Sequence, residues 1–187
     1  MCGIAGYFGS DVTEELVRSM ADALIHRGPD DAGVWLDGAD GISFSHRRLS
    51  IVDLSTEGHQ PMLSASGRYV IAFNGEIYNH VELRTKLDQS SASIAWRGHS
   101  DTETLLACFE AWGIRKTLDL IVGMFAISLW DQSERRLHLM RDRFGEKPLY
   151  YGWVGSGFVF GSELKALRRH PSFGNSIDRN VLALYLQ

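Results

Sequence analysis

The apolar segments of this chain are short and often come in pairs joined by turns, which constrains the fold more than any other feature of the sequence. Short runs rich in β-branched and aromatic residues, bounded by turn residues, are typical of strands in hairpins. Hairpins are more evident here than strand–helix–strand units, which favours an α+β fold over a doubly wound sheet. The expected strands are residues 3–8, 33–36, 42–46, 69–73, 124–130, 136–140, 149–153 and 158–160.

Other segments carry apolar residues at helical spacing. We expect helices from an N-cap at Thr13 to about His26, over residues 80–87, from Asp101 onward, over residues 162–169, and after an N-cap at Asp178. Residues 53–67 are expected to form a polar loop, and Asn74-Gly75 a tight turn after a buried strand.

The last helix is largely apolar, and such an exposed face normally requires a partner. It carries Val181, Leu182, Leu184, Tyr185 and Leu186. We therefore expect one domain over residues 1–175 and, over residues 176–187, the start of a truncated C-terminal domain.

Composition and charge exclude several classes of function. Nineteen basic and 23 acidic residues give a net charge of −4, without a block of like charge, so nucleic acid and anionic membranes are poor partners. No segment approaches the roughly 20 apolar residues that cross a bilayer, and no targeting signal is evident, so we expect a cytoplasmic protein. Two cysteines form neither a disulfide framework nor a zinc pattern, the histidines match no metal motif, and no metal is expected.

Cys2 is the first candidate for chemistry. Removal of Met1 would place a thiol, with a reference pKa of about 8.5, and an α-amine, with one of about 7.7–8.0, on the same residue. The amine could then accept the thiol proton, and the thiolate could attack a carbonyl. A cysteine at position two is usually without such a role, so the rest of the sequence decides between the two interpretations. The second cysteine, Cys108, lies on the apolar side of an expected helix and reads as an inert core residue.

Several sequence motifs occur here in the same order as in a known protein family. They are MCGIAG at residues 1–6, HRGPDDAG at 26–33, HRRLSIVDLS at 46–55, NGEIYNH at 74–80, HSDTE at 99–103, RDRFGEKPLYYG at 141–152 and FVFGSELKAL at 158–167. Together they resemble the glutaminase domain of asparagine synthetases, a class II glutamine amidotransferase of the N-terminal nucleophile type. The resemblance covers residues 2–170.

The resemblance implies a fold and an activity. The fold would be the four-layer αββα sandwich of N-terminal nucleophile hydrolases, with two antiparallel sheets. Cys2 would hydrolyse free L-glutamine to glutamate and ammonia without a cofactor in this domain. The ammonia would pass to a C-terminal synthetase domain that uses ATP and Mg²⁺ and is absent from these residues. A homodimer is a further possibility.

The same resemblance assigns roles to individual residues. Asn74 and Gly75 would form an oxyanion hole, although the dipeptide alone would be read as a hairpin turn. Arg48, assisted by backbone carbonyls near Ile51 and Val52, would bind the α-carboxylate of glutamine, and Asp101 would bind its ammonium group. Glu76 would complete the polar pocket. Residues 26–30 would shape the wall beside the nucleophile, and residues 141–151 would form part of the surface facing the second domain.

Three alternatives remain from the sequence. The acceptor of the ammonia could be a carboxylate other than aspartate, as in relatives from surface polysaccharide pathways. The domain could belong to a glucosamine-phosphate synthase type of enzyme, which the NGEIYNH and HRGPDDAG strings argue against. It could also be a catalytically silent module that docks a synthetase, which the complete set of site residues argues against.

Overall fold

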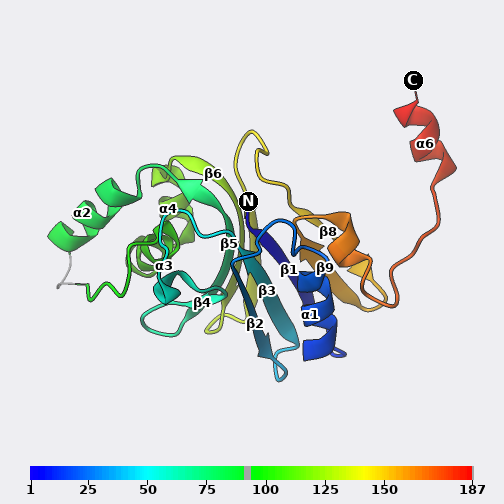
Figure 1. Cartoon of the computed structure of the whole chain (residues 1–187), viewed down its shortest axis with the longest axis horizontal. Coiled ribbons are helices and arrows are strands. Elements are labelled where there is room, and N and C mark those ends of the chain that lie inside the picture. Colours follow the sequence, from blue (N-terminus) through cyan, green and yellow to red (C-terminus); the bar gives the residue numbers. More distant parts are fainter. Residues whose placement is uncertain (91–93, 187) are drawn as a thin grey trace.

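The computed structural model of the chain describes residues 1–90 and 94–186 (Figure 1). It contains two sheets, and every strand pairing in this part of the chain is antiparallel. The five-stranded sheet has the order β2 (Asp31–Asp37), β3 (Ile42–Arg48), β1 (Gly3–Phe8), β9 (Gly157–Gly161) and β8 (Tyr150–Val154). The four-stranded sheet has the order β4 (Met62–Leu63), β5 (Tyr69–Ile77), β6 (Gly123–Asp131) and β7 (Arg136–Arg141).

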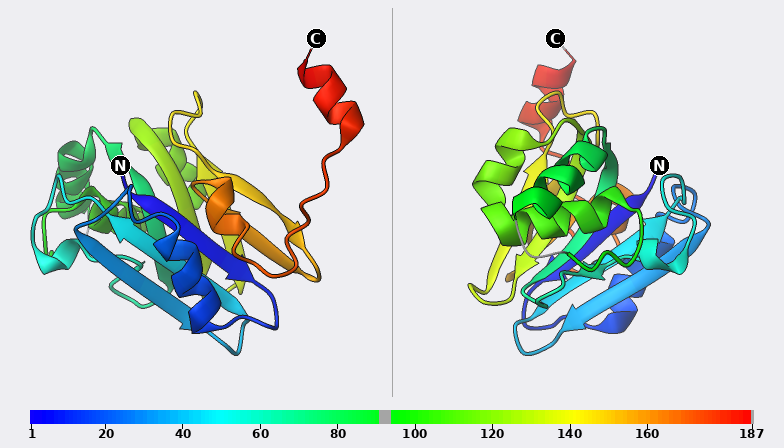
Figure 2. Two further views of the ribbon diagram at one scale, coloured as in Figure 1. Left: turned by 45° about the vertical axis from the view of Figure 1, so that its right-hand side comes forward. Right: turned by 90° about the vertical axis from the view of Figure 1, so that its left-hand side faces the viewer.

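Helices cover the outer faces of both sheets (Figure 2). The five-stranded sheet is covered by α1 (Glu14–Asp22) and α5 (Leu164–Leu167), and the four-stranded sheet by α2 (His80–Ser90), α3 (Asp101–Trp112) and α4 (Ile114–Leu120). A short 3₁₀ helix, η1 (Thr56–Gly58), precedes β4, and α6 (Arg179–Tyr185) stands apart from the sheets (Figure 1). The expected α+β fold and αββα layering are confirmed.

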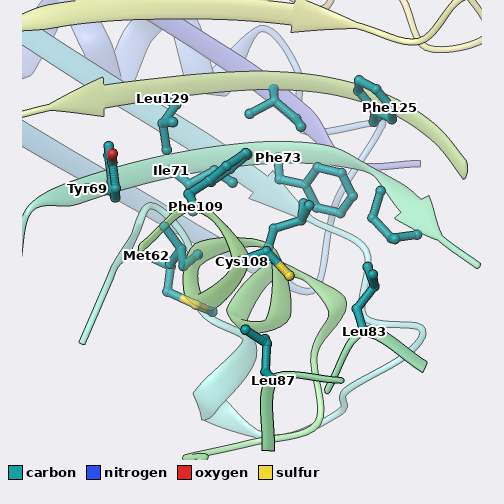
Figure 3. Packing of buried hydrophobic residues seen from close by; sticks show 14 residues of the cluster. Met62, Tyr69, Ile71, Phe73, Leu83, Leu87, Cys108, Phe109, Phe125 and Leu129 are labelled. Carbon is teal, nitrogen blue, oxygen red and sulfur yellow. The ribbon is translucent and has the colours of Figure 1, made fainter. Parts of the chain in front are cut away.

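Period-two alternation explains how β5 joins two cores, because successive side chains of a strand point to opposite faces. Val70 and Ala72 pack between the sheets with Phe44, whereas Ile71 and Phe73 face the helices. Figure 3 shows the helix-side cluster, which also contains Met62, Tyr69, Leu83, Leu87, Cys108, Phe109, Phe125 and Leu129. Burial raises the pKa of the Cys108 thiol to about 12, as suits an unreactive core cysteine.

Most expected elements appear within a few residues of their predicted limits. Thr13 caps α1 by accepting from Leu16 N–H, and Asp178 caps α6. The first helix ends four residues early, at Asp22, because the chain continues as turns. The short strand β4, inside the expected loop, and the helix α4 were not predicted. Within the described residues, no helix has the length and apolar character needed to cross a membrane.

The predicted tight turn at Asn74-Gly75 is wrong. Both residues lie inside β5 and pair with Ala126 and Phe125 of β6. An Asn-Gly hairpin turn needs positive φ angles at both residues, whereas pairing with β6 continues to Ile77 and keeps the backbone extended. The long strand partner therefore overrides the local preference of the dipeptide.

A hydrogen bond links the two sheets near these residues. His46, in β3, lies with its Nε2 3.0 Å from the Phe73 carbonyl oxygen of β5. Burial lowers the pKa of His46 to about 4, so the ring is neutral near pH 7 and Nε2–H is the donor.

We expect this histidine to make the fold sensitive to acid. Between about pH 6.5 and pH 4 the unfolded chain binds a proton on His46 and the folded chain does not, so the free energy of unfolding falls as the pH decreases. The component is on the order of 3 kcal/mol. Urea unfolding at pH 7 and pH 4.5 should show a smaller pH dependence for His46→Gln, which retains a donor but does not titrate. Equal pH dependence in the two proteins would contradict this account.

Gly75 is required by the close approach of β6. A Cβ atom at this position would overlap the carbonyl oxygen of Met124, a backbone atom that cannot move aside. We expect Gly75→Ala to destabilise the fold by about 1–3 kcal/mol, as overpacking typically does. The control is Gly152→Ala in β8, where a Cβ atom would meet no neighbour within 4 Å. The midpoint of urea denaturation should fall for the first variant and change much less for the second.

Candidate active site

A pocket forms where the start of β1, from one sheet, meets the edge of β5, from the other, beside the N-terminus of α3. Its lining contains all the residues that the sequence singled out, namely Cys2, Arg48, Ile51, Val52, Asn74, Gly75, Glu76 and Asp101. It also contains residues that were not predicted, namely Met1, Leu49, Asp53, Gly58, Gln60, Phe73, Ser100, Thr102, Met124 and Lys147.

The Cys2 thiol is held by backbone groups. Its Sγ lies 3.4 Å from the Leu49 nitrogen, which donates to it, and 3.6 Å from the Leu49 carbonyl oxygen. Burial raises the pKa of the Cys2 thiol, and the contact with Leu49 and the positive charge of Arg48 oppose this effect. The thiol is therefore protonated near pH 7, and its use as a nucleophile requires a base.

The loop at residues 26–30 contacts the backbone of both Cys2 and Arg48. Arg27 donates through Nε to the Cys2 carbonyl oxygen at 2.9 Å, and its Nη1 lies 2.9 Å from the Glu163 carboxylate. A Cβ atom at Gly28 would overlap the backbone of Arg47 and Arg48. The loop thus contacts the backbone of Cys2, as expected, but none of residues 26–30 lines the pocket.

Arg48 is 7% exposed and is fixed by the loop that follows it. Its guanidinium donates to the carbonyl oxygens of Asp53 and Ser55. The carboxylate of Asp53 accepts from the Ser55 hydroxyl and from the backbone N–H groups of His99 and Ser55. Although burial acts to raise it, these bonds lower the pKa of Asp53 to about 2. The loop therefore holds a cation rigidly at the pocket wall.

The edge of β5 presents hydrogen-bond donors to the pocket. Beyond the end of β4, Phe73 N–H donates to Gln60 Oε1 at 2.7 Å, and Ile77 N–H donates to Asp101 Oδ2 at 2.9 Å. Alternate residues of a strand direct their N–H groups to the same edge, so the N–H of Gly75 faces the gap between these two contacts. The adjacent Asn74 amide nitrogen, Nδ2, is buried and has no hydrogen-bond partner among the described residues. Both donors belong to residues that line the pocket.

Asp101 supplies a buried negative charge on the same side of the pocket. It is the first residue of α3, which is capped by Ser100, and its carboxyl group is 6% exposed. Burial raises its pKa, and the bond from Ile77 opposes this effect. Among the described residues no cation forms an ion pair with it, Arg48 included, so the two opposite charges of the pocket are held apart.

Lys147 was missed as a pocket residue. It is 7% exposed and lies in the segment that the sequence assigned to an interdomain surface. Asp142 fixes this segment by accepting from the backbone N–H groups of Phe125, Phe144, Glu146 and Lys147. An Asp followed by a Gly three residues later is a turn signal and could have indicated an ordered loop, although not its direction.

Within the described residues, no group of three or more His, Cys, Asp and Glu side chains is placed to hold a metal ion. The residues that line the pocket offer a thiol, amide donors, a guanidinium and carboxylates. These groups fit nucleophilic attack on the carbonyl of a small zwitterion.

The sequence of the chain is similar to those of known glutamine amidotransferases. The family model described as a glutamine amidotransferase domain matches residues 1–187. Asparagine synthetase (glutamine-hydrolysing) 2 of Bacillus subtilis is 40% identical over 177 residues, which are 91% of this chain and 23% of that protein. Asparagine synthetase 3 of the same organism is 39% identical over 98% of this chain and 30% of that protein. A putative asparagine synthetase of Mycobacterium tuberculosis is 40% identical over 98% of this chain and 29% of that protein.

A solved structure supports the fold independently. Glutamine phosphoribosylpyrophosphate amidotransferase from B. subtilis, complexed with ADP and GMP, superimposes with a TM-score of 0.74 at 20% identity, over 89% of this chain and 43% of that chain. This chain spans less than a third of the length of each of the three curated synthetases named above. The match over its whole length, the αββα layers and the glutamine-hydrolysing relatives lead to one conclusion: the chain belongs to the glutamine amidotransferase domain family.

Proposed function

We propose that this domain hydrolyses free glutamine to glutamate and ammonia, with Cys2 as the nucleophile after removal of Met1. The observation that carries the proposal is that one pocket is lined by a thiol, two amide donors, a fixed cation and a buried carboxylate that forms no ion pair among the described residues. The glutamine-hydrolysing relatives support the same reaction.

The proposed reaction uses these groups in turn. The free α-amine of Cys2 takes the thiol proton, and Sγ attacks the side-chain carbonyl carbon of glutamine. The negative charge that develops on the carbonyl oxygen is received by Asn74 Nδ2–H and Gly75 N–H. The amine then protonates the departing nitrogen, ammonia leaves, and a thioester remains. Water cleaves the thioester, releases glutamate and restores the thiol.

Substrate selection would rest on the two separated charges. Arg48 has the planar geometry to pair with an α-carboxylate, with backbone carbonyls at Ile51 and Val52 beside it. Asp101 would accept from the α-ammonium group, and Glu76 would complete the polar wall. A glutamine inside a peptide lacks both charges, so the pocket would select the free amino acid.

The ammonia would serve an ATP- and Mg²⁺-dependent synthetase domain, with aspartate as the default acceptor. The names of the relatives and the small share of their length that this chain covers support this partner. We assign residues 1–175 to the glutaminase and residues 176–187 to the start of the synthetase domain. In the described part of that second segment, the apolar side chains of α6 are exposed, as expected of a helix that packs on further chain; Gln187 lies outside the described residues. A different acceptor carboxylate and a silent docking module remain the alternatives.

The nucleophile is tested by ammonia release from free glutamine. The sample is protein whose intact mass shows Cys2 as the first residue, with Cys2→Ala as the control. We expect release from the first protein and none from the second. Protein that keeps Met1 should also be inactive, because an amide nitrogen cannot accept the proton. A folded, correctly processed protein that releases no ammonia would favour the silent docking module.

The ammonium contact is tested by Asp101→Asn, which keeps the shape of the side chain and removes its charge. The loss of a charged hydrogen bond should raise the KM for glutamine by about 10- to 100-fold, with a smaller change in kcat. Glu110→Gln, on the same helix but outside the pocket, is the matched control and should leave KM unchanged. A KM that is equal in all three proteins would exclude Asp101 from substrate binding.

A further inference from the structure

The groups of the proposed reaction lie on two different sheets. Cys2 immediately precedes β1 of the five-stranded sheet, and the donors Asn74 and Gly75 belong to β5 of the four-stranded sheet. No backbone ladder joins the two sheets in the described structure. Their distance and offset beside the pocket must therefore be set by side chains.

Apolar packing alone does not define that offset sharply. The contact between the sheets consists of residues such as Ile4, Phe44, Val70 and Ala72, and the attraction among them is non-directional. A misplacement of about 1 Å between reacting groups can cost on the order of 100-fold in rate. A hydrogen bond between the sheets close to the site would fix the offset of one sheet relative to the other.

We propose that His46 and Gln60 are positioning residues, which act through the backbone of Phe73 to hold the oxyanion hole of the proposed glutaminase against its nucleophile. The inference rests on the proposed function, because it concerns the geometry of that same site. Neither side chain contacts the reacting atoms in this scheme. His46 lies outside the pocket lining, and Gln60 lines the pocket but directs its amide oxygen and nitrogen to Phe73 N–H and Thr102 Oγ1.

Phe73 is the residue through which both side chains act, because it directly precedes Asn74. Its carbonyl oxygen accepts from His46 Nε2–H at 3.0 Å, and its N–H donates to Gln60 Oε1 at 2.7 Å. In the sheet, β4 covers β5 only at Val70 and Ile71. At Phe73, two side chains thus replace the missing neighbouring strand.

The two side chains anchor Phe73 to different parts of the site. His46 is paired with Ile4 in the register of β3 and β1, so its hydrogen bond joins β3, the neighbour of the strand that follows Cys2, to the strand of the oxyanion donors. Gln60 donates through Nε2 to Thr102 Oγ1 at 3.1 Å, which connects Phe73 to the residue after Asp101. The segments that carry Cys2, the two donors and Asp101 are thus linked through the backbone of Phe73.

The bonding state of His46 fits a positioning role rather than acid–base catalysis. The residue is 1% exposed, and among the described residues its buried Nδ1 has no hydrogen-bond partner. A histidine that exchanged protons with substrate would need a second contact in the pocket, and His46 is not among the pocket-lining residues. The structure therefore leaves Nε2–H as a single fixed donor.

The test combines kinetics with a measurement that does not depend on activity. Steady-state glutamine hydrolysis is measured for the processed chain and for His46→Leu, His46→Gln and Gln60→Leu. We expect His46→Leu and Gln60→Leu to lower kcat by about 10- to 100-fold and to change KM for glutamine by less than about 3-fold, because Arg48 and Asp101 keep their own supports. His46→Gln retains a donor and should recover most of the lost kcat.

Two matched controls address general effects of substitution. His138→Leu removes a half-buried histidine from β7, and Gln132→Leu removes a glutamine that donates to the Gly67 carbonyl oxygen, far from the pocket. Both should keep the kcat of the parent protein. Thermal unfolding of every variant shows whether it folds, and His46→Gln and Gln60→Leu serve as the tests if His46→Leu does not.

Amide hydrogen exchange of the peptide that covers residues 73–77 gives the independent readout. Exchange should be faster in His46→Leu and Gln60→Leu than in the parent protein and in both controls. Folded variants with unchanged kcat and unchanged exchange would overturn the proposal. Absence of hydrolysis in the parent protein would instead refute the proposed function, and unchanged exchange in the same experiment would then refute the positioning role as well.

Discussion

The face-to-face packing of two antiparallel sheets decides where every group of the pocket lies. The Cys2 thiol lies just before the central strand of one sheet, and the Asn74 and Gly75 amide groups come from a stretch of β5 that β4 leaves uncovered. The backbone groups at this edge are either bound by side chains or turned toward the pocket. Because β5 extends beyond the end of β4, its uncovered edge presents N–H donors in a fixed direction. No special backbone conformation is needed at Asn74 or Gly75.

The charges of the pocket are arranged before any substrate arrives. Arg48 is held by the carbonyl oxygens of its own loop, and Asp101 by the N–H of Ile77. Neither group neutralises the other, so a zwitterion would meet two charges that are already desolvated and oriented. Such preorganisation reduces the ordering that binding would otherwise require.

The strands and helices could be predicted from the sequence more readily than their arrangement in layers. A short apolar run ended by turn residues located the strand Gly3–Phe8 with the correct limits, because such a run is a local signal. The four layers followed only from family resemblance. The turn assigned to Asn74-Gly75 failed since the preference of two residues is weaker than pairing along the whole of β5.

In the pocket, too, the sequence predicted some residues and not others. The identity of Arg48, Asn74 and Asp101 as candidates came from motifs, and the structure brings them together with Cys2. Gln60, His46 and Lys147 could not be recognised in the same way. Their roles depend on contacts between segments far apart in the chain, such as the hydrogen bond from Gln60 to Thr102, and no local pattern encodes such contacts.

The central place of β1 also bears on the order of events during synthesis. The Ser162 hydroxyl that accepts from Ile4 N–H lies 158 residues after Ile4 in the chain, and β9, a neighbour of β1, directly precedes Ser162. At 5–20 residues per second, roughly 10–30 s separate the synthesis of the two. During that interval β1 lacks one of its two neighbouring strands. The five-stranded sheet can therefore be completed only after the segment that contains β8 and β9 has been made.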